Sequence, residues 1–349
     1  MYYLILRGGE FFTKNIKTPR SIGTENVLKI NPSMNQKFAD NIQSGLSAVE
    51  KSIPYIYFYN ERGSWLFQQI MQLPEYYLTT CEISILDRYK DELLDYFKAK
   101  KKRFNLVDLG AGDASKTKSL LQNYVEKGVD FTYTPIDLST SILSALSESL
   151  DAAYPDLKHE AMNKDYWEAM EALSQNSSKT ERKVVLFLGA NIGNFTYEES
   201  VSFLTKLKSY LNPGDQVLIG FDLKKRPEII YKAYLDSKGI TAAFNLNLLH
   251  RINQELGANF KTNYFRFYPY YNPQTGELRS HLVSQKDQTV KIEALDLEVK
   301  FEQWESIHTE ISKKHTIKEI ENLATAAGFT IKEHFLDSKA YFVDTLLEF

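Results

Sequence analysis

The stretch VDLGAGDASKTKSLL, which begins at Val107, has the residue types of a cofactor-binding turn. Gly110 and Gly112 follow an apolar run, as glycines do in the fingerprint that binds dinucleotides. Gly110 and the pair Lys116-Thr117 also come close to the P-loop of proteins that bind nucleoside triphosphates. A tight glycine turn suits S-adenosylmethionine as well, so the stretch alone leaves three classes of cofactor open.

Ser115 stands where both phosphate-binding motifs require a glycine. A P-loop has glycine directly before its Lys-Ser/Thr pair, because backbone N–H groups must wrap the phosphate chain there. The dinucleotide fingerprint has its third glycine at the same place, for the pyrophosphate and for close helix packing. S-adenosylmethionine has no phosphate groups, so the sequence favours it over a nucleotide.

An acid that binds the ribose hydroxyls of the cofactor is expected after the next strand. Asp137 ends the apolar run 133–136, at the sheet edge where ligands bind in open α/β folds. Capping of the helix that follows Ser139 is the alternative role for this side chain. After the third strand, Asp165 and Tyr166 offer a polar contact and an aromatic ring for adenine. In this order, the residues predict a site for S-adenosylmethionine.

Aromatic residues are unusually frequent, with 22 Tyr and 21 Phe in 349 residues. They cluster at 55–59, 76–77 and 264–271. Methyl transfer from a sulfonium requires two aligned molecules shielded from water, and cationic atoms near the reaction centre favour aromatic faces. Each such contact is worth about 0.5–2 kcal/mol. Core packing is the alternative use of these rings.

Two later segments carry polar candidates for the acceptor. Asn194, in the glycine-rich run 189–196 after the fourth strand, can donate to a carboxylate and accept from an amine. A simple turn is the alternative. If 309–312 is extended, Glu310 and Ser312 share one side and can bind the N–H and the nitrogen of an imidazole. If it caps the helix near Thr316, it is structural.

The elements that position these residues follow a βαβ pattern from residue 105 onward, which predicts a parallel sheet. A short loop at 336–339 predicts that the last two strands form an antiparallel hairpin. Such a seven-stranded sheet is the layout of class I methyltransferases, a Rossmann-like α/β fold. We expect strands at 105–109, 131–137, 157–162, 184–188, 215–221, 330–335 and 340–347, and helices at 116–127, 143–154, 199–211 and 316–327.

The remaining residues predict a second, α+β substrate-binding domain. It contains a helix-like part at 227–256 and a strand-like part at 264–301, with a hairpin turn at 272–276. We expect the cofactor domain at 80–224 and 314–349, and the substrate domain at 20–79 and 225–313.

Bulk properties exclude several classes of protein. A net charge of -3 and a pI near 6.1 give no case for nucleic acid. Cys81 is the only cysteine, and the six histidines lack metal-binding spacing, so we expect neither a disulfide nor a metal site. No apolar run predicts a membrane span or a signal peptide, so we expect a cytoplasmic protein. The basic run 98–103 is expected to be a solvated helix end.

Longer motifs resemble the histidine-specific S-adenosylmethionine-dependent methyltransferases. They are YNERGSWLF from Tyr59, LPEYYLT from Leu73, GANIGNFT from Gly189, ITAAFNLNLLHRINQELGANF from Ile240 and TEISKKH from Thr309. The resemblance runs from about residue 40 to the end of the chain. It implies a class I fold, S-adenosylmethionine as the cofactor, and three successive Nα-methylations of L-histidine to hercynine in ergothioneine biosynthesis.

The resemblance also implies roles for single residues. In the family pattern Asn194 and Tyr234 hold the α-amino acid end of histidine, while Glu310 and Ser312 hold the imidazole. Tyr59, on the amine side, and Asn194 correspond to residues at the reaction centre. Lys116 would balance the carboxylate of the methionine portion of the cofactor. The positions that correspond to cofactor contacts are Gly110, Lys116, Asp137, Asp165 and Tyr166, and those that correspond to substrate contacts are Tyr76, Asn194, Tyr234, Glu310 and Ser312.

Ser280 departs from the family pattern, which usually has methionine at a position that lines the substrate ring pocket. The tract YYLTTCEISIL, from Tyr76, is also similar to fungal relatives that methylate prenylated tryptophan. Another aromatic amino acid or a histidine derivative is therefore the alternative acceptor, and a cofactor-binding protein without turnover is a further one. For the histidine pathway, a separate sulfur-inserting enzyme is the expected partner.

Overall fold

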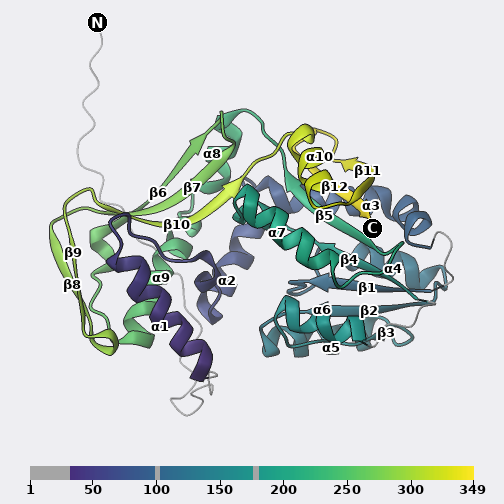
Figure 1. The fold of residues 1–349 in the computed structure, drawn as a ribbon, viewed down its shortest axis with the longest axis horizontal. Helices are drawn as coiled ribbons and strands as arrows, with labels where there is room; N and C mark the ends of the chain where they lie inside the picture. Colours follow the sequence, from purple (N-terminus) through teal and green to yellow (C-terminus); the bar gives the residue numbers. More distant parts are fainter. Residues whose placement is uncertain (1–31, 99–102, 176–180) are drawn as a thin grey trace, which may run out of the picture.

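The computed structural model describes residues 32–98, 103–175 and 181–349 of the chain. Its main sheet has seven strands in the order β11-β12-β5-β4-β1-β2-β3. Strands β3, β2, β1, β4 and β5 pair in parallel, whereas β12 lies antiparallel between β5 and β11 (Figure 1). The predicted class I methyltransferase sheet is therefore confirmed. Its strands are β1 (Phe104–Leu109), β2 (Phe131–Ile136), β3 (Lys158–His159), β4 (Arg182–Phe187), β5 (Gln216–Asp222), β11 (Thr330–Leu336) and β12 (Phe342–Glu348).

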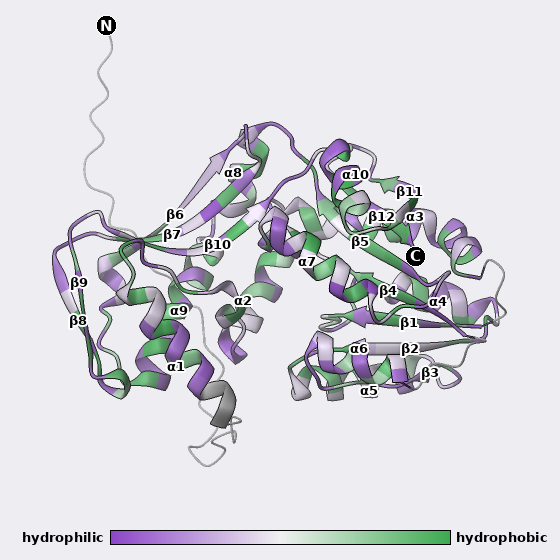
Figure 2. Ribbon diagram, in the orientation of Figure 1, coloured by the Kyte–Doolittle hydropathy of each residue, from purple (hydrophilic) through white to green (hydrophobic). Residues whose placement is uncertain are grey.

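Helices cover both faces of this sheet, so its central strands are buried on both sides. Successive residues of β1 alternate between two apolar clusters, with Leu106 in one and Val107 in the other. Figure 2 shows hydrophobic residues along β5, in the middle of the sheet. The first cluster is completed by α3 (Tyr77–Lys98), α4 (Lys118–Glu126) and α5 (Thr140–Ala153), and the second by α6 (Tyr166–Gln175), α7 (Tyr197–Lys208) and α10 (Ile317–Ala326).

Two of these helices begin at capping boxes. Thr196 accepts a hydrogen bond from the backbone N–H of Glu199, whose carboxylate accepts one from the N–H of Thr196. Thr316 and Glu319 form the same box at the start of α10. A capping box satisfies two N–H groups that have no partner inside the helix. The predicted helices at 199–211 and 316–327 are confirmed, although the first begins earlier, at Tyr197.

The second part of the structure is built on a three-stranded antiparallel sheet in the order β10-β7-β6. An apolar cluster joins it to α1, α2 and α9 and to the separate hairpin β8–β9, at the left of the view in Figure 1. The predicted hairpin turn at 272–276 is confirmed between β6 and β7. The elements are α1 (Pro32–Ser47), α2 (Glu61–Met71), α8 (Pro227–Tyr234), α9 (Ile240–Leu256), β6 (Phe265–Asn272), β7 (Glu277–Ser284), β8 (Gln288–Ile292), β9 (Leu297–Phe301) and β10 (Ser306–Lys313).

The structure differs from the sequence predictions in three elements. The helix-like part 227–256 is two helices, because Asp236 binds three backbone N–H groups in the turn between them. The third strand, predicted at 157–162, is shortened to the two residues of β3. Met162 pairs with Ile136 of β2 only through an isolated bridge. Helix α6 was not predicted.

The division into two domains stays a prediction, and α8 packs into the first cluster of the main sheet through Ile230 and Ala233. Most of the basic run 98–103 and the segment 20–31 lie outside the described residues. Within the described residues, no helix is long and apolar enough to cross a membrane.

Candidate active site

The glycine turn follows β1 at the edge of the main sheet. Gly110 and Gly112 have φ angles of +76° and +55°, which favour glycine. The N–H groups of Gly110 and Ala111 both donate to the carbonyl of Ile136, which ties the turn to β2. A Cβ at Gly110 would lie 2.8 Å from the hydroxyl of Tyr166, whereas no atom lies within 4 Å of the Cβ position of Gly112. The turn thus has no room for a side chain at Gly110, whereas the space beside Gly112 is free.

Asp137 lies beside this turn, at the carboxyl end of β2. Its Oδ2 accepts from the N–H of Gly112 at 3.1 Å, and its Oδ1 accepts from the N–H of Ser139 at 2.9 Å. Ser139, rather than Asp137, caps α5 with its own side chain. A carboxylate offers about four lone-pair positions, so two remain for the ribose hydroxyls of the cofactor. The position of Asp137 beside the glycine turn and its two unused lone-pair positions fit that role.

Asp165 and Tyr166 begin α6, which brings the tyrosine to the glycine turn. Asp165 Oδ1 accepts from the backbone N–H groups of Trp167 and Glu168, so a helix cap accounts for this oxygen. The ring of Tyr166 packs edge-on against Phe187, and its hydroxyl is the group next to Gly110. The structure therefore places Tyr166 at the turn itself, and its predicted adenine contact stays a prediction.

Lys116 lies between the glycine turn and the loop after β4. Its Nζ is 2.9 Å from Oε2 of Glu82, a fully buried carboxylate on α3 whose Oε1 accepts from the N–H of Gly189 at 2.7 Å. A Cβ at Gly189 would lie 2.7 Å from the same Nζ. Sequence reasoning missed Glu82, although an acid on the apolar face of α3 was a signal. Lys116 thus has a protein carboxylate as partner, and its contact with the cofactor carboxylate stays a prediction.

Tyr59 and the five residues predicted to contact the substrate share one cavity. It opens to solvent and lies between the main sheet and the second part of the structure. The loop after β4 contributes Gly189 to its wall, which joins the cavity to the surroundings of Lys116. The six residues in the wall are Tyr59, Tyr76, Asn194, Tyr234, Glu310 and Ser312.

Strand β10 presents Glu310 and Ser312 on the same side of the cavity. The segment is extended, with a bulge between His308 and Glu310, and Thr316 caps α10 without it. The alternative in which 309–312 caps that helix is therefore excluded. Burial raises the pKa of Glu310 to about 7, and the charge of Lys314 lowers it in part.

Aromatic rings form another part of the cavity wall. The ring of Tyr59 meets Phe67 and Phe244 edge-on, at centroid distances of 5.6 and 5.8 Å. Tyr76 meets Phe67 and Tyr234 in the same way, at 6.3 and 6.5 Å. Phe67 and Phe244 also line the cavity, and sequence reasoning did not single them out. The rings offer the faces and hydroxyls that a nitrogen gaining positive charge favours.

Asn194 ends a short 3₁₀ turn, η2 (Asn191–Asn194), after β4. The chain enters this turn with Gly189 and Ala190 at φ angles of +84° and +55°. Gly193 lies directly against β10, because a Cβ there would be 2.8 Å from the carbonyl oxygen of Lys313. This contact fixes the amide of Asn194 relative to the strand that carries Glu310.

Ser280 is not among the residues that line the cavity. It is fully buried on β7, opposite Glu310 in the register of β7 and β10. Its Oγ has no hydrogen-bond partner among the described residues, while its carbonyl accepts from Thr309 Oγ1. Directly opposite residues share one face of a sheet, so any effect of Ser280 on the acceptor would pass through its neighbour Glu310.

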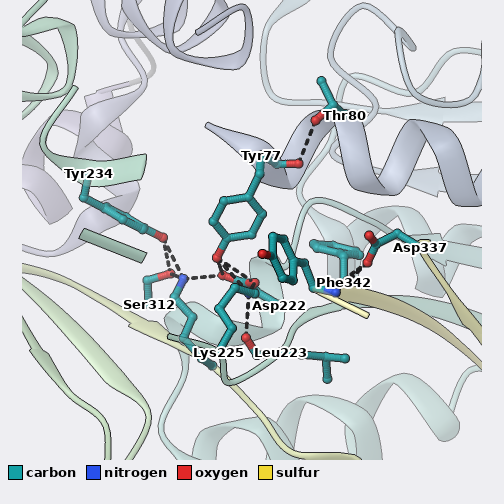
Figure 3. Close-up of polar contacts among 11 residues, drawn as sticks. Tyr77, Thr80, Asp222, Leu223, Lys225, Tyr234, Ser312, Asp337 and Phe342 are labelled. Carbon is teal, nitrogen blue, oxygen red and sulfur yellow. Dashed lines mark hydrogen bonds and ion pairs between the residues drawn. The ribbon is translucent and has the colours of Figure 1, made fainter. Parts of the chain in front are cut away.

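A buried polar network around Asp222 includes two residues that line the cavity, Tyr234 and Ser312 (Figure 3). Tyr234 and Ser312 are joined by a hydrogen bond of 2.7 Å between their hydroxyls. Lys314 donates to both hydroxyl oxygens and pairs with Asp222 at the carboxyl end of β5. Lys225 and the hydroxyl of Tyr77 bind the same aspartate from the other side. Sequence reasoning pointed to none of the three charged residues.

Comparison with known proteins identifies the family. The family described as "Histidine-specific methyltransferase, SAM-dependent" matches residues 38–349. Histidine N-alpha-methyltransferases of Mycolicibacterium smegmatis and Mycobacterium tuberculosis are each 35% identical to this chain. The alignments cover 78% of this chain and 83% of the first protein, and 82% of this chain and 87% of the second. An L-tryptophan methyltransferase of Psilocybe serbica is 25% identical, over 84% of this chain and 87% of that protein.

These matches agree with the sheet order and with the glycine turn beside Asp137. The chain is an S-adenosylmethionine-dependent methyltransferase, so the alternative of a binding protein without turnover falls away. It belongs to the family of histidine-specific, S-adenosylmethionine-dependent methyltransferases.

Proposed function

We propose that this enzyme is an L-histidine Nα-methyltransferase, which converts its substrate to Nα,Nα,Nα-trimethylhistidine in three successive steps. The observation that carries the proposal is the pairing of Glu310 with Ser312 on one side of the cavity. A neutral imidazole has one N–H donor and one nitrogen acceptor, which match a carboxylate and a hydroxyl. The names of the two mycobacterial relatives support the same acceptor.

The other cavity residues take the α-amino acid end. The amide of Asn194 can donate to the carboxylate or accept from the amine, and Tyr234 can donate to the carboxylate. Burial raises the pKa of Tyr76 well above its usual value, so this hydroxyl stays protonated at neutral pH. Bound S-adenosylmethionine supplies the methyl group from its sulfonium. The residues of this chain hold the amine in line and exclude water.

The reaction itself is the first test. Incubation of the purified enzyme with L-histidine and S-adenosylmethionine should give products heavier by one, two and three methyl groups in mass spectrometry. In a time course, the trimethylated product, hercynine, should appear after the products with one and two methyl groups. If histidine stays unmodified while tryptophan or one of its derivatives gains methyl groups, the proposed acceptor is wrong.

Ser280 motivates a second candidate acceptor, another aromatic amino acid or a histidine derivative. We expect Ser280→Met, which introduces the residue usual in the family, to raise the preference for histidine over tryptophan about tenfold. The measurement is the ratio of kcat/KM for the two amino acids. Ser284→Met is the matched control, because Ser284 is also fully buried on β7 but lies away from Glu310. An unchanged ratio in Ser280→Met would remove this position from the determinants of specificity.

We further propose a place for the enzyme in ergothioneine biosynthesis, in the cytoplasm, with a separate enzyme that inserts sulfur into the trimethylated product. The names of relatives in two fungi, called ergothioneine biosynthesis proteins, support the pathway. Detection of hercynine in cells that express this chain, and its loss when the gene is deleted, would test the assignment.

A further inference from the structure

Lys314 is a fully buried cation directly beneath the substrate cavity. Its Nζ donates to Oδ2 of Asp222, to the hydroxyl of Tyr234 and to Oγ of Ser312, each at 2.8 Å. An ammonium group has three N–H donors, so all of them are used. Burial alone would lower the pKa of Lys314, but the charge of Asp222 raises it above its usual value. Lys314 therefore stays charged at neutral pH.

The two hydroxyls are constrained by this arrangement. Because each oxygen accepts an N–H from Lys314, neither hydroxyl proton can point at the cation. One proton lies in the 2.7 Å bond between Tyr234 and Ser312, and the other is left for the cavity. A ligand with two acceptors at this end can take both protons, since each oxygen keeps its bond from Lys314. The hydroxyls of Tyr234 and Ser312 thus donate hydrogen bonds to a ligand in the cavity, whereas the carboxylate of Glu310 accepts one.

We infer that Lys314 is a positioning residue for the substrate, because it commits Tyr234 and Ser312 to donate their protons into the cavity. The inference rests on the proposed function and deepens it. A neutral histidine offers a ring nitrogen with a lone pair and an α-carboxylate to these two donors. An indole ring has an N–H and no lone-pair nitrogen, so a buried hydroxyl proton would stay unpaired. Lys314 itself touches no substrate atom.

Lys314 also acts on Glu310 through its charge. Within the described residues, Glu310 interacts electrostatically with Lys314 and with the hydroxyls of Tyr55, Tyr59, Tyr76 and Tyr234. Raised pKa values keep these tyrosines neutral, so Lys314 is the one charged group among them. Removal of that charge raises the pKa of Glu310. The shift is a readout that a purely structural role of Lys314 would not give.

The test compares Lys314→Met with Lys225→Met in the full chain. Lys225 is the matched control because it is nearly buried and pairs with Asp222, but it donates to Tyr77 and not to the hydroxyl pair. We expect Lys314→Met to raise the KM and Kd for histidine about tenfold or more, with little change in the Kd for S-adenosylmethionine. The acid limb of kcat/KM should move to higher pH. Lys225→Met should keep the KM and the pH profile of the wild type.

Several outcomes would overturn the inference. A folded Lys314→Met enzyme with unchanged KM and an unshifted acid limb would do so, as would an equal loss in Lys225→Met. If circular dichroism shows that the methionine variant is unfolded, Lys314→Gln replaces it, because glutamine is neutral but still polar toward Asp222. The same shift of the acid limb is then expected, and its absence contradicts the role.

The design separates this inference from the proposed function. If the wild-type enzyme methylates tryptophan and not histidine, the proposed acceptor is wrong. The effect of Lys314 on the hydroxyl that donates to the α-carboxylate then still predicts about tenfold weaker binding of tryptophan in Lys314→Met. Unchanged binding of tryptophan in that variant would overturn the inference on its own.

Discussion

Replacement of Glu310 by alanine is expected to raise the KM for histidine about 10- to 100-fold and to leave the Kd for S-adenosylmethionine nearly unchanged. Loss of the carboxylate leaves an imidazole N–H without its partner inside the cavity, and hydrogen bonds to charged groups are worth about 1.5–3 kcal/mol. Calorimetry of the cofactor and steady-state kinetics of histidine measure the two effects separately. An equal loss of both would indicate misfolding in place of a substrate contact.

Glu310→Gln is the matched control for the charge of this side chain. Because burial raises the pKa of Glu310 to about 7, the carboxylate becomes protonated as the pH falls through neutrality. The affinity of the wild type for histidine should therefore decrease below about pH 7 and be fully present above it. In Glu310→Gln this limb should vanish, leaving only the protonation of the substrate imidazole near its ordinary value of about 6.5. An identical pH dependence of the Kd in both enzymes would contradict the role of Glu310.

Much of the cofactor half could be predicted from local sequence. The parallel strands from β1 to β5 follow from apolar runs of the right length, and the final hairpin follows from a short loop between two such runs. The glycine turn and Asp137 come together because each follows a strand of a parallel sheet, and those strand ends meet at one edge. Local pattern and tertiary position agree at this site.

The acceptor half could not be predicted from pattern alone. Tyr59, Tyr234 and Glu310 reach one cavity from segments far apart in the sequence, and the family resemblance grouped them before the structure did. Buried ion pairs were missed for a related reason. Asp222 and Lys314 are both charged residues at strand ends. In the sequence, a charged residue at such a position predicts an exposed side chain, whereas both are fully buried in the structure. Only the tertiary fold shows that the two charges compensate each other.

Ser280 and α6 mark two further limits of local reasoning. The resemblance placed Ser280 in the ring pocket, whereas the structure buries its side chain beside its cross-strand neighbour Glu310, outside the residues that line the cavity, and its role in specificity stays a prediction. Asp165 directly precedes α6, and its residue type fits a ligand contact and an N-cap equally well. Its bonds to backbone N–H groups show the cap, and its contact with the cofactor stays a prediction.

A second large effect is expected from Gly193→Ala, which we predict to lower kcat/KM for histidine about 100-fold. The new Cβ would lie 2.8 Å from the carbonyl oxygen and 3.3 Å from the nitrogen of Lys313, both backbone atoms of β10. Backbone atoms cannot turn aside as a flexible side chain can, so η2 and β10 must move apart. This displacement separates Asn194 from Glu310, and a misplacement of about 1 Å can cost about 10²-fold in rate.

The control for Gly193→Ala is Gly128→Ala, at the end of α4. Gly128 has a φ of +60° and no atom within 4 Å of its Cβ position, so alanine there adds backbone strain without a collision. We expect both variants to lose about 1–3 kcal/mol of unfolding free energy in urea titrations. Only Gly193→Ala should lose activity, and its Kd for S-adenosylmethionine should stay close to that of the wild type. Normal kcat/KM in Gly193→Ala would show that the contact of η2 with β10 does not set the geometry of the acceptor site.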